Sequence, residues 1–131
     1  MKKFLALAIS LVAIAVCAFM TACGDVKPVV ITATNESFDF NNKKLIDYMT
    51  YLQDEGDLTY EISNDGMLTS INGTSNTTNS YWMLYTDDTE NSNEAWGTYE
   101  HEGKTYFSAV AGANDLAIKE GCIYIWAYQT F

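Results

Sequence analysis

Near its carboxyl end the chain reads Ile123-Tyr124-Ile125-Trp126-Ala127-Tyr128, an unbroken alternation of aliphatic and aromatic residues. An earlier stretch, Tyr81-Trp82-Met83-Leu84-Tyr85, has a similar composition. A period of two and an enrichment in β-branched and aromatic residues are typical of strands. We therefore expect both stretches to lie in one sheet, and the faces of that sheet decide how the domain is built.

Alternate side chains of a strand point to opposite faces of a sheet, which predicts two chemically different surfaces. The first face is expected to pack beneath a helix and to carry Trp82, Leu84, Ile123 and Ile125. The second face would be an aromatic surface suited to a flat ligand or a partner protein. Its candidate ligand-binding residues are Tyr81, Met83, Tyr85, Trp96, Tyr124, Trp126 and Tyr128. The alternative is that these rings form a second small core under the loops that contain Trp96, Tyr99 and Tyr106.

The remaining segments predict one helix among several strands. Residues 29–34 are rich in β-branched side chains, and residues 41–53 repeat apolar groups at helical spacing, with Ser37 or Asp39 as a cap. Further strands are expected at 58–62, 67–71, 96–99 and 105–110. This order predicts an α+β domain, in which a single helix packs on one face of a mainly antiparallel, β-grasp-like sheet.

The amino-terminal residues have the three parts of a secretory signal. Two lysines precede an apolar run over residues 4–20, which is followed by small residues and Cys23. The stretch Met20-Thr21-Ala22-Cys23 resembles the bacterial lipobox, in which the chain is cut before a lipidated cysteine. A membrane-spanning helix is the alternative, because about 17 apolar residues are near the lower limit for crossing a bilayer. The small residues and the cysteine favour cleavage.

These features divide the chain into three parts. Residues 1–22 are predicted to be a lipoprotein signal peptide, 23–28 the lipidated amino terminus and a short tether, and 29–131 a single domain. Two or three acyl chains on Cys23 would anchor the protein stably, where one chain is marginal. The expected location is therefore extracytoplasmic, with a lipid anchor in the bacterial cell membrane and no span across it.

The charge of the expected mature chain limits its partners. Without the signal it keeps five lysines, no arginine and all seventeen acidic residues, which gives a formal net charge of −12. Such a chain is not expected to bind nucleic acid or anionic lipid surfaces. A strongly acidic surface favours cationic or neutral ligands.

Three segments together carry a family resemblance: Ser70-Ile71-Asn72-Gly73, residues 81–85, and the closing residues 116–124. Over about residues 29–128 the chain resembles the transcobalamin-like C-terminal domain family. In vertebrate cobalamin carriers this small β-rich domain closes over the corrin, and it also occurs in bacterial surface lipoproteins. The resemblance implies a ligand-binding lipoprotein that captures cobalamin or another corrinoid for delivery to a transporter. A cell-surface module that binds protein or glycan is the alternative.

Catalytic and metal-binding patterns are missing from the sequence. His101 is the only histidine and lies between two glutamates, and no nucleophile, phosphate-loop or dinucleotide motif is present. We therefore expect no enzyme activity and no resident cofactor. The acidic loop 87–94 has oxygen ligands suited to calcium but lacks the spacing of an EF-hand, so a solvated loop is favoured. With Cys122 as the only cysteine left in the domain, no internal disulfide is expected.

Overall fold

The computed structural model describes residues 26–131, so the predicted signal peptide (1–22) and the lipidation site Cys23 lie outside the described residues. The elements are β1 (Val29–Thr32), α2 (Leu45–Asp54), β2 (Tyr60–Ile62), β3 (Leu68–Ile71), β4 (Thr74–Ser75), β5 (Ser80–Thr86), the 3-10 helix η2 (Thr89–Asn91), β6 (Ser92–His101), β7 (Lys104–Ala109) and β8 (Ile123–Thr130). Within this part of the chain, none of the helices is long and apolar enough to pass through a membrane.

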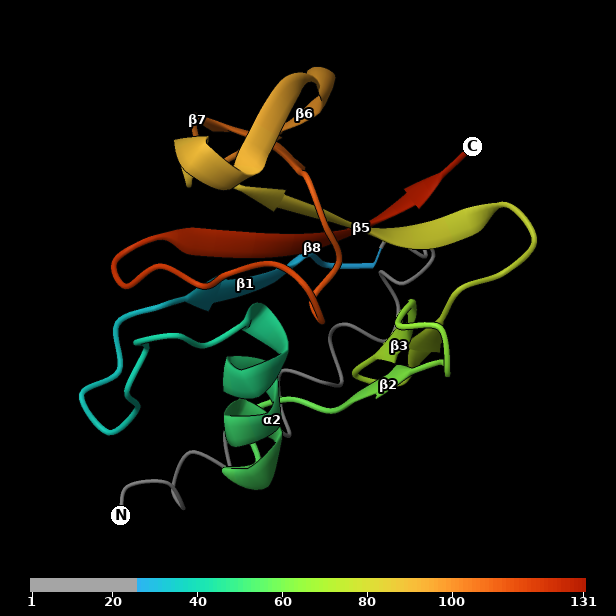
Figure 1. The fold of residues 1–131 in the computed structure, drawn as a ribbon. Coiled ribbons are helices and arrows are strands. Elements are labelled where there is room, and N and C mark those ends of the chain that lie inside the picture. Colours follow the sequence, from blue (N-terminus) through green and yellow to red (C-terminus); the bar gives the residue numbers. More distant parts are fainter. Residues whose placement is uncertain (1–25) are drawn as a thin grey trace.

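The strands form two antiparallel sheets instead of the one that the sequence suggests. Five strands pair in the order β1-β8-β5-β7-β6, and β2-β3-β4 form a separate three-stranded sheet. In Figure 1, α2 and the small sheet lie on the same side of β1, β8 and β5, whereas the β6–β7 hairpin curls over the opposite side. The prediction of an α+β domain with a mainly antiparallel sheet and α2 on one face is confirmed.

The helix begins later than predicted. Its first residue is Leu45, and Lys44 occupies the N-cap position. The Lys44 side chain makes no capping hydrogen bond. The carboxylate of Asp39 accepts the backbone N–H two residues later at 3.0 Å, so it stabilises a turn ahead of the helix. The prediction that Ser37 or Asp39 caps the helix is therefore wrong. The Asp39 carboxylate already accepts a hydrogen bond within this turn, ahead of the first residue of the helix.

The two faces of β8 are inverted relative to the prediction. In the β5–β8 ladder, Leu84 lies opposite Trp126, Trp82 opposite Tyr128, and Thr86 opposite Tyr124. Residues directly opposite one another in a ladder point to the same face of the sheet. The rings of β8 therefore share the helix-side face with Trp82 and Leu84, which the sequence had placed correctly.

The largest side chains of β8 consequently lie inside the main core. Tyr124 and Trp126 are 0% and 4% exposed, and they belong to the same cluster of buried residues as Leu45 and Met49 of α2. The partly buried Tyr128 packs against this cluster. The prediction that these three rings form an exposed binding face is wrong.

The buried phenol of Tyr124 is accommodated by a single backbone contact. Its hydroxyl accepts the N–H of Lys119 at 2.8 Å. Burial raises the pKa of the Tyr124 hydroxyl to about 12, so the group remains neutral over the physiological range. A hydrogen-bonded, neutral phenol can lie in an apolar interior at little cost.

The opposite face of the main sheet has a smaller core of its own. It contains the buried residues Tyr85, Tyr106, Ile125 and Ala127, and Met83, Tyr99 and Ile123 pack against it. The rings of Tyr85 and Tyr99 are stacked, with their centroids 5.3 Å apart. The prediction that Ile123 and Ile125 lie beneath the helix is therefore wrong. The expected alternative, in which the rings form a second small core under the segments of Tyr99 and Tyr106, holds for Met83 and Tyr85. It does not hold for the rings of β8, which lie in or against the main core, or for the exposed Trp96.

Candidate functional site

The seven predicted binding residues are distributed over several environments. Those of β8 lie in or against the helix-side core, and Met83 and Tyr85 belong to the second core. The partly buried Tyr81 lies beside the carboxyl-terminal Phe131, with ring centroids 6.3 Å apart. Trp96 is the one strongly exposed member, at 63%. The structure therefore does not bring these residues together as one aromatic platform.

Trp96 is exposed because it lies in a bulge of β6. The pairing of β6 with β7 shifts between Asn93 and Thr98, so the residues between these two lie outside the regular ladder. Gly97, at the end of the bulge, has a φ of +137°, which favours glycine. The bulge projects the Trp96 side chain from the edge strand into solvent.

An open cavity of about 200 Å³ involves the predicted residues Met83 and Trp126. A second, larger cavity of about 420 Å³ is lined by residues 26–29, Ile71, Asn72, Thr74 and Trp82. The first cavity is lined by the turn before β3, by β5, by the segment after β7 and by β8. Trp82, Met83 and Trp126 contribute to its walls, together with Met67 and Ala111. Met67 is 49% exposed, which places an adaptable apolar side chain at the surface of this site.

The indole N–H of Trp126 is a polar group without a partner. Its Nε1 atom is buried, and no atom of residues 26–131 accepts its hydrogen bond. The indole of Trp82, which also lines the cavity, donates to the carbonyl oxygen of Thr74 at 2.8 Å. Buried indole N–H groups usually find an acceptor, and leaving one unpaired costs about 1–3 kcal/mol. The wall of the cavity thus includes a residue with an unused hydrogen-bond donor.

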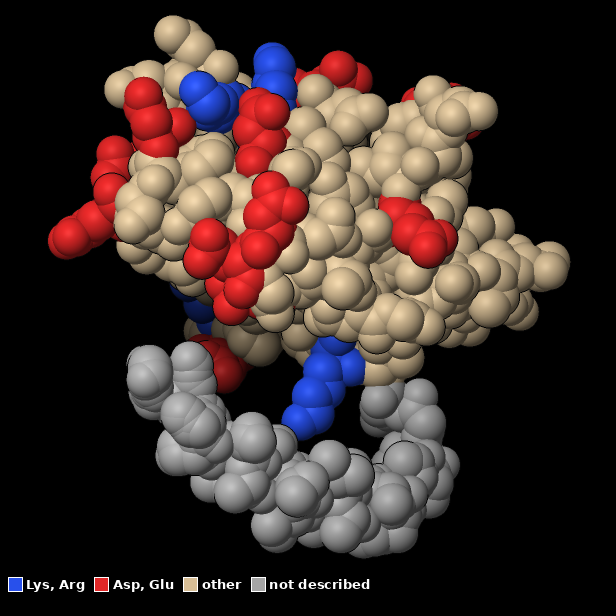
Figure 2. Space-filling model, turned by 90° about the horizontal axis from the view of Figure 1, so that it is seen from below, with Lys and Arg blue, Asp and Glu red and all other residues tan. Residues whose placement is uncertain are grey.

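The surroundings of the cavity carry little charge. No acidic or basic residue occurs between Asp65 and Asp87, a segment that supplies the cavity walls from β3 and β5. Figure 2, which views the molecule from below, shows acidic side chains gathered on the left, while most of the right side carries neither sign. The predictions from the sequence used the acidic balance of the chain but not this uncharged run, which could have indicated the site.

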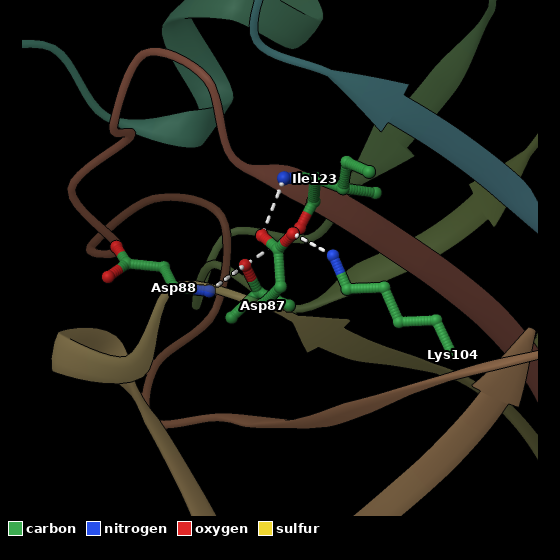
Figure 3. A network of polar contacts seen from close by, with 5 residues as sticks. Asp87, Asp88, Lys104 and Ile123 are labelled. Atoms are coloured by element: carbon green, nitrogen blue, oxygen red, sulfur yellow. Dashed lines mark hydrogen bonds and ion pairs between the residues drawn. The ribbon is translucent and has the colours of Figure 1, made fainter.

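The end of β5 is held by a polar network around Asp87 (Figure 3). One carboxylate oxygen of Asp87 accepts the N–H of Ile123 at 2.8 Å, and the other accepts a hydrogen bond from Nζ of Lys104 at 2.8 Å. Burial alone would raise the pKa of the Asp87 carboxyl, but the Ile123 N–H and the Lys104 ammonium outweigh burial and lower this pKa below its usual value. The ionised Asp87 therefore joins β5, β7 and β8.

The neighbouring Asp88 is buried, at 2% exposure. One of its carboxylate oxygens accepts the N–H of Glu90 at 3.1 Å, and the other accepts the side-chain amide of Asn91 at 2.8 Å. The acidic segment 87–94 forms η2 and the start of β6 and is not the irregular loop that was predicted. Thr89, Glu90 and Glu94 are exposed as expected, whereas Asp88 is buried. Over residues 26–131, no cluster of three or more acidic, histidine or cysteine side chains is placed to hold a metal ion.

Cys122 is a partly buried thiol. It packs against the helix-side core, and burial, followed by the negative charges of Asp87 and Asp88, raises the pKa of the thiol. The thiol is therefore protonated at neutral pH, and protonated thiols are poor nucleophiles. Its surroundings agree with the interpretation of Cys122 as a small apolar residue.

Comparisons of the chain with protein-family models, curated proteins and solved structures returned no match. The cavity beside Trp126 and the exposed bulge at Trp96 are two structural features at which a ligand or partner could bind.

Proposed function

We propose that the chain is an extracytoplasmic lipoprotein, attached to the bacterial cell membrane through Cys23, whose domain binds an uncharged ligand in the cavity beside Trp126. The observation that carries the proposal is the cavity itself, an open site of about 200 Å³ with no charged residue in its lining. On a chain with ten more negative than positive charges, an uncharged site favours neutral ligands. The role is capture and not catalysis, with a transporter as the recipient of the ligand.

The proposed anchor explains how such a protein would stay beside a membrane transporter. The tether is short, because β1 begins at Val29, six residues after Cys23. Two or three acyl chains on this cysteine suffice for stable attachment without a transmembrane helix. The domain would then be held close to the outer surface of the membrane.

Replacing Cys23 with alanine is expected to abolish lipid attachment. Cells fed radiolabelled palmitate should label the parent protein, and the label should be lost almost completely from Cys23→Ala. The matched control is Cys122→Ala, which removes the only cysteine of the described residues and should keep the label. A Cys23→Ala protein that still incorporates palmitate would exclude the anchor at this position.

The resemblance to the transcobalamin-like C-terminal domain supports a finer proposal, in which the fold is β-grasp-like and the ligand is cobalamin or another corrinoid. The cavity is smaller than the 300–1,000 Å³ typical of sites that enclose drug-sized ligands. A corrin could therefore place only a peripheral group in the cavity, while its ring lay across the surface near Met67. Such an arrangement leaves the other face of the corrin for a second protein.

Titration of the detergent-solubilised full chain with cobalamin and cobinamide tests this ligand. We expect an absorbance change and a dissociation constant below about 1 mM, which corresponds to roughly −4 kcal/mol of binding free energy. Ala111→Leu, which fills part of the cavity, should weaken binding at least about tenfold, the effect of losing roughly 1.4 kcal/mol. Trp96→Ala should leave the affinity unchanged. The absence of both heat and an absorbance change at 1 mM ligand would rule out a corrinoid.

A surface module for protein or glycan is the second candidate, because Trp96 is an exposed aromatic residue on an edge strand. Aromatic residues of this kind often dominate the binding energy of an interface. The variants Trp96→Ala and Ala111→Leu distinguish this surface module from a protein that binds its ligand in the cavity. A partner held by this surface is lost with Trp96→Ala and retained with Ala111→Leu.

A further inference from the structure

We infer that the second cavity, formed by residues 26–29, the turn after β3 and Trp82, binds an amphiphile with one acidic head group, a carboxylate or a phosphate, and an apolar tail. This cavity shares only Trp82 with the cavity beside Trp126, so the inference goes beyond the proposed binding of an uncharged ligand. The volume of the second cavity, its buried apolar residues and its single positive charge support this ligand class.

The second cavity is large enough for a ligand of moderate size. Its volume of about 420 Å³ lies within the range of about 300–1,000 Å³ that is typical of small-molecule sites, whereas the cavity beside Trp126 lies below this range. Three parts of the chain, far apart in sequence, enclose it: the segment that leads into β1, the turn between β3 and β4, and β5. A tail of several methylene groups can therefore be accommodated.

The most buried residues of the lining are apolar. Ile71 and Trp82 are 0% and 6% exposed, and the partly buried Pro28 and Val29 extend their apolar surface. The indole N–H of Trp82 already donates to the carbonyl oxygen of Thr74 at 2.8 Å, so this ring offers only apolar contact. Each methylene group buried here should raise the affinity about fourfold, which corresponds to about 0.8 kcal/mol.

The lining carries one charge, and it is positive. The exposed Lys27 is the only ionisable residue that lines the cavity, and it makes no ion pair within the described residues, unlike Lys104 and Lys119. The neighbouring stretches 28–35 and 66–86 contain no charged residue. Salt screens exposed charges that are more than about 8 Å apart, which limits the repulsion from acidic residues elsewhere on the domain. The local charge therefore favours an anion.

Asn72 adds hydrogen-bond donors to the lining. Its side-chain oxygen accepts the backbone N–H of Thr59 at 3.0 Å, so the NH2 group is the end of this amide that is left for a ligand. The φ of Asn72 is +48°, a value that asparagine tolerates in tight turns. An ammonium group and an amide NH2 group both donate, so the complementary head group is rich in acceptor oxygens, as carboxylates and phosphates are.

The location of the cavity suits a ligand that concentrates at membranes. Val26, which lines the cavity, follows Cys23 by three residues, a stretch that spans at most roughly 10 Å. The proposed anchor would therefore hold this cavity close to the bilayer surface, into which amphiphiles partition. Only this location depends on the anchor; the ligand class depends on the lining of the cavity.

Three compounds with the same tail test the head group: octanoate, octan-1-ol and octylammonium. The ¹⁵N-labelled full chain in phosphatidylcholine nanodiscs is titrated with each, and the backbone N–H signals are followed by NMR. We expect octanoate to bind about three to five times more tightly than octanol, the range that an exposed ion pair gives, and octylammonium to bind most weakly. The signals of Lys27, Asn72 and Thr74 should shift, and those of Met67 and Ala111 beside the other cavity should shift much less.

Two substitutions separate the head from the tail. Lys27→Gln should remove the preference for octanoate and leave the affinity for octanol unchanged. Lys44→Gln, which changes an exposed lysine outside the lining, should keep the preference. Val26→Trp, which fills part of the cavity from the segment before β1, should weaken both compounds equally.

Equal affinities for octanoate and octanol would overturn the inference, and so would a preference that survives Lys27→Gln or binding without a response of residues 26–29 and 72–74. Nanodiscs that contain phosphatidylglycerol distinguish the two sources of the acidic head. A shift of the Lys27 and Asn72 signals with this lipid alone, lost in Lys27→Gln, would identify a membrane lipid as the occupant. A response to octanoate only would identify a free amphiphile, and a response to neither would exclude the site.

Discussion

Replacing Trp126 with alanine is expected to lower the free energy of unfolding by about 3–5 kcal/mol, the usual cost of removing a large buried ring. The side chain is 4% exposed and lies in the core formed with α2. Urea denaturation followed by far-ultraviolet circular dichroism measures the change. The loss should exceed any gain from removing the unpaired indole N–H, because the truncation leaves a cavity beside Leu84 and Tyr124.

Trp96→Ala is the matched control for this variant, since it removes the same side chain from a bulge that is open to solvent. It should change the free energy of unfolding by no more than about 0.5 kcal/mol. If Trp126→Ala had an equally small effect, the ring could not lie in the main core. The original prediction, with the rings of β8 on an exposed face, would then be restored.

Asp88→Ala is expected to lower the free energy of unfolding by about 2–4 kcal/mol. The substitution leaves the N–H of Glu90 and the side-chain amide of Asn91 without the carboxylate that accepts their hydrogen bonds. Hydrogen bonds to charged groups contribute about 1.5–3 kcal/mol each, and their loss is only partly recovered by water. Asp88→Asn should cost less, because the amide keeps one oxygen acceptor.

Glu90→Ala serves as the control in the same segment. The Glu90 side chain is exposed and makes only a 3.7 Å ion pair with Lys119, a type of contact worth at most about 1 kcal/mol. Equal and small effects of both substitutions would support a solvated loop at 87–94, as the sequence alone predicts. A large effect of Asp88→Ala alone would show that the buried carboxylate organises this segment.

The elements themselves were largely predictable because their signals are local. The alternation in residues 81–85 and 123–128 predicted β5 and β8, and the turn residues near Gly103 agreed with the β6–β7 hairpin. The placement of Trp82 and Leu84 on the helix side also followed from the pattern. By contrast, the short strand β4 lies in a polar segment whose composition is typical of a loop.

The residues of β8 alone could not predict which face of this strand packs against the helix. Alternation shows that two faces differ, but it does not show which of them meets the helix. That choice depends on the pairing of Leu84 with Trp126, residues 42 positions apart, and on a helix-side interior large enough for rings. Asp87 was misjudged for a similar reason, because its partners Lys104 and Ile123 are distant in sequence.

The candidate cavity was only partly predictable. Trp126 and Met83 had been selected, but for an aromatic surface that does not exist in that form. Met67 and Ala111 carried no signal, since each is an ordinary apolar residue until the fold brings it beside β5 and β8. A site assembled from four separate segments depends on tertiary packing, which periodicity within one segment does not report.

The irregularity of β6 also affects how copies of this protein can coexist. A straight, ten-residue strand at the border of a sheet offers unpaired backbone groups to any neighbouring chain and invites aggregation. The break in pairing between Asn93 and Thr98 twists this border, and the exposed Glu94 and Glu100 add mutual repulsion. Crowded side by side on a two-dimensional surface, such molecules would be discouraged from joining their sheets into fibres.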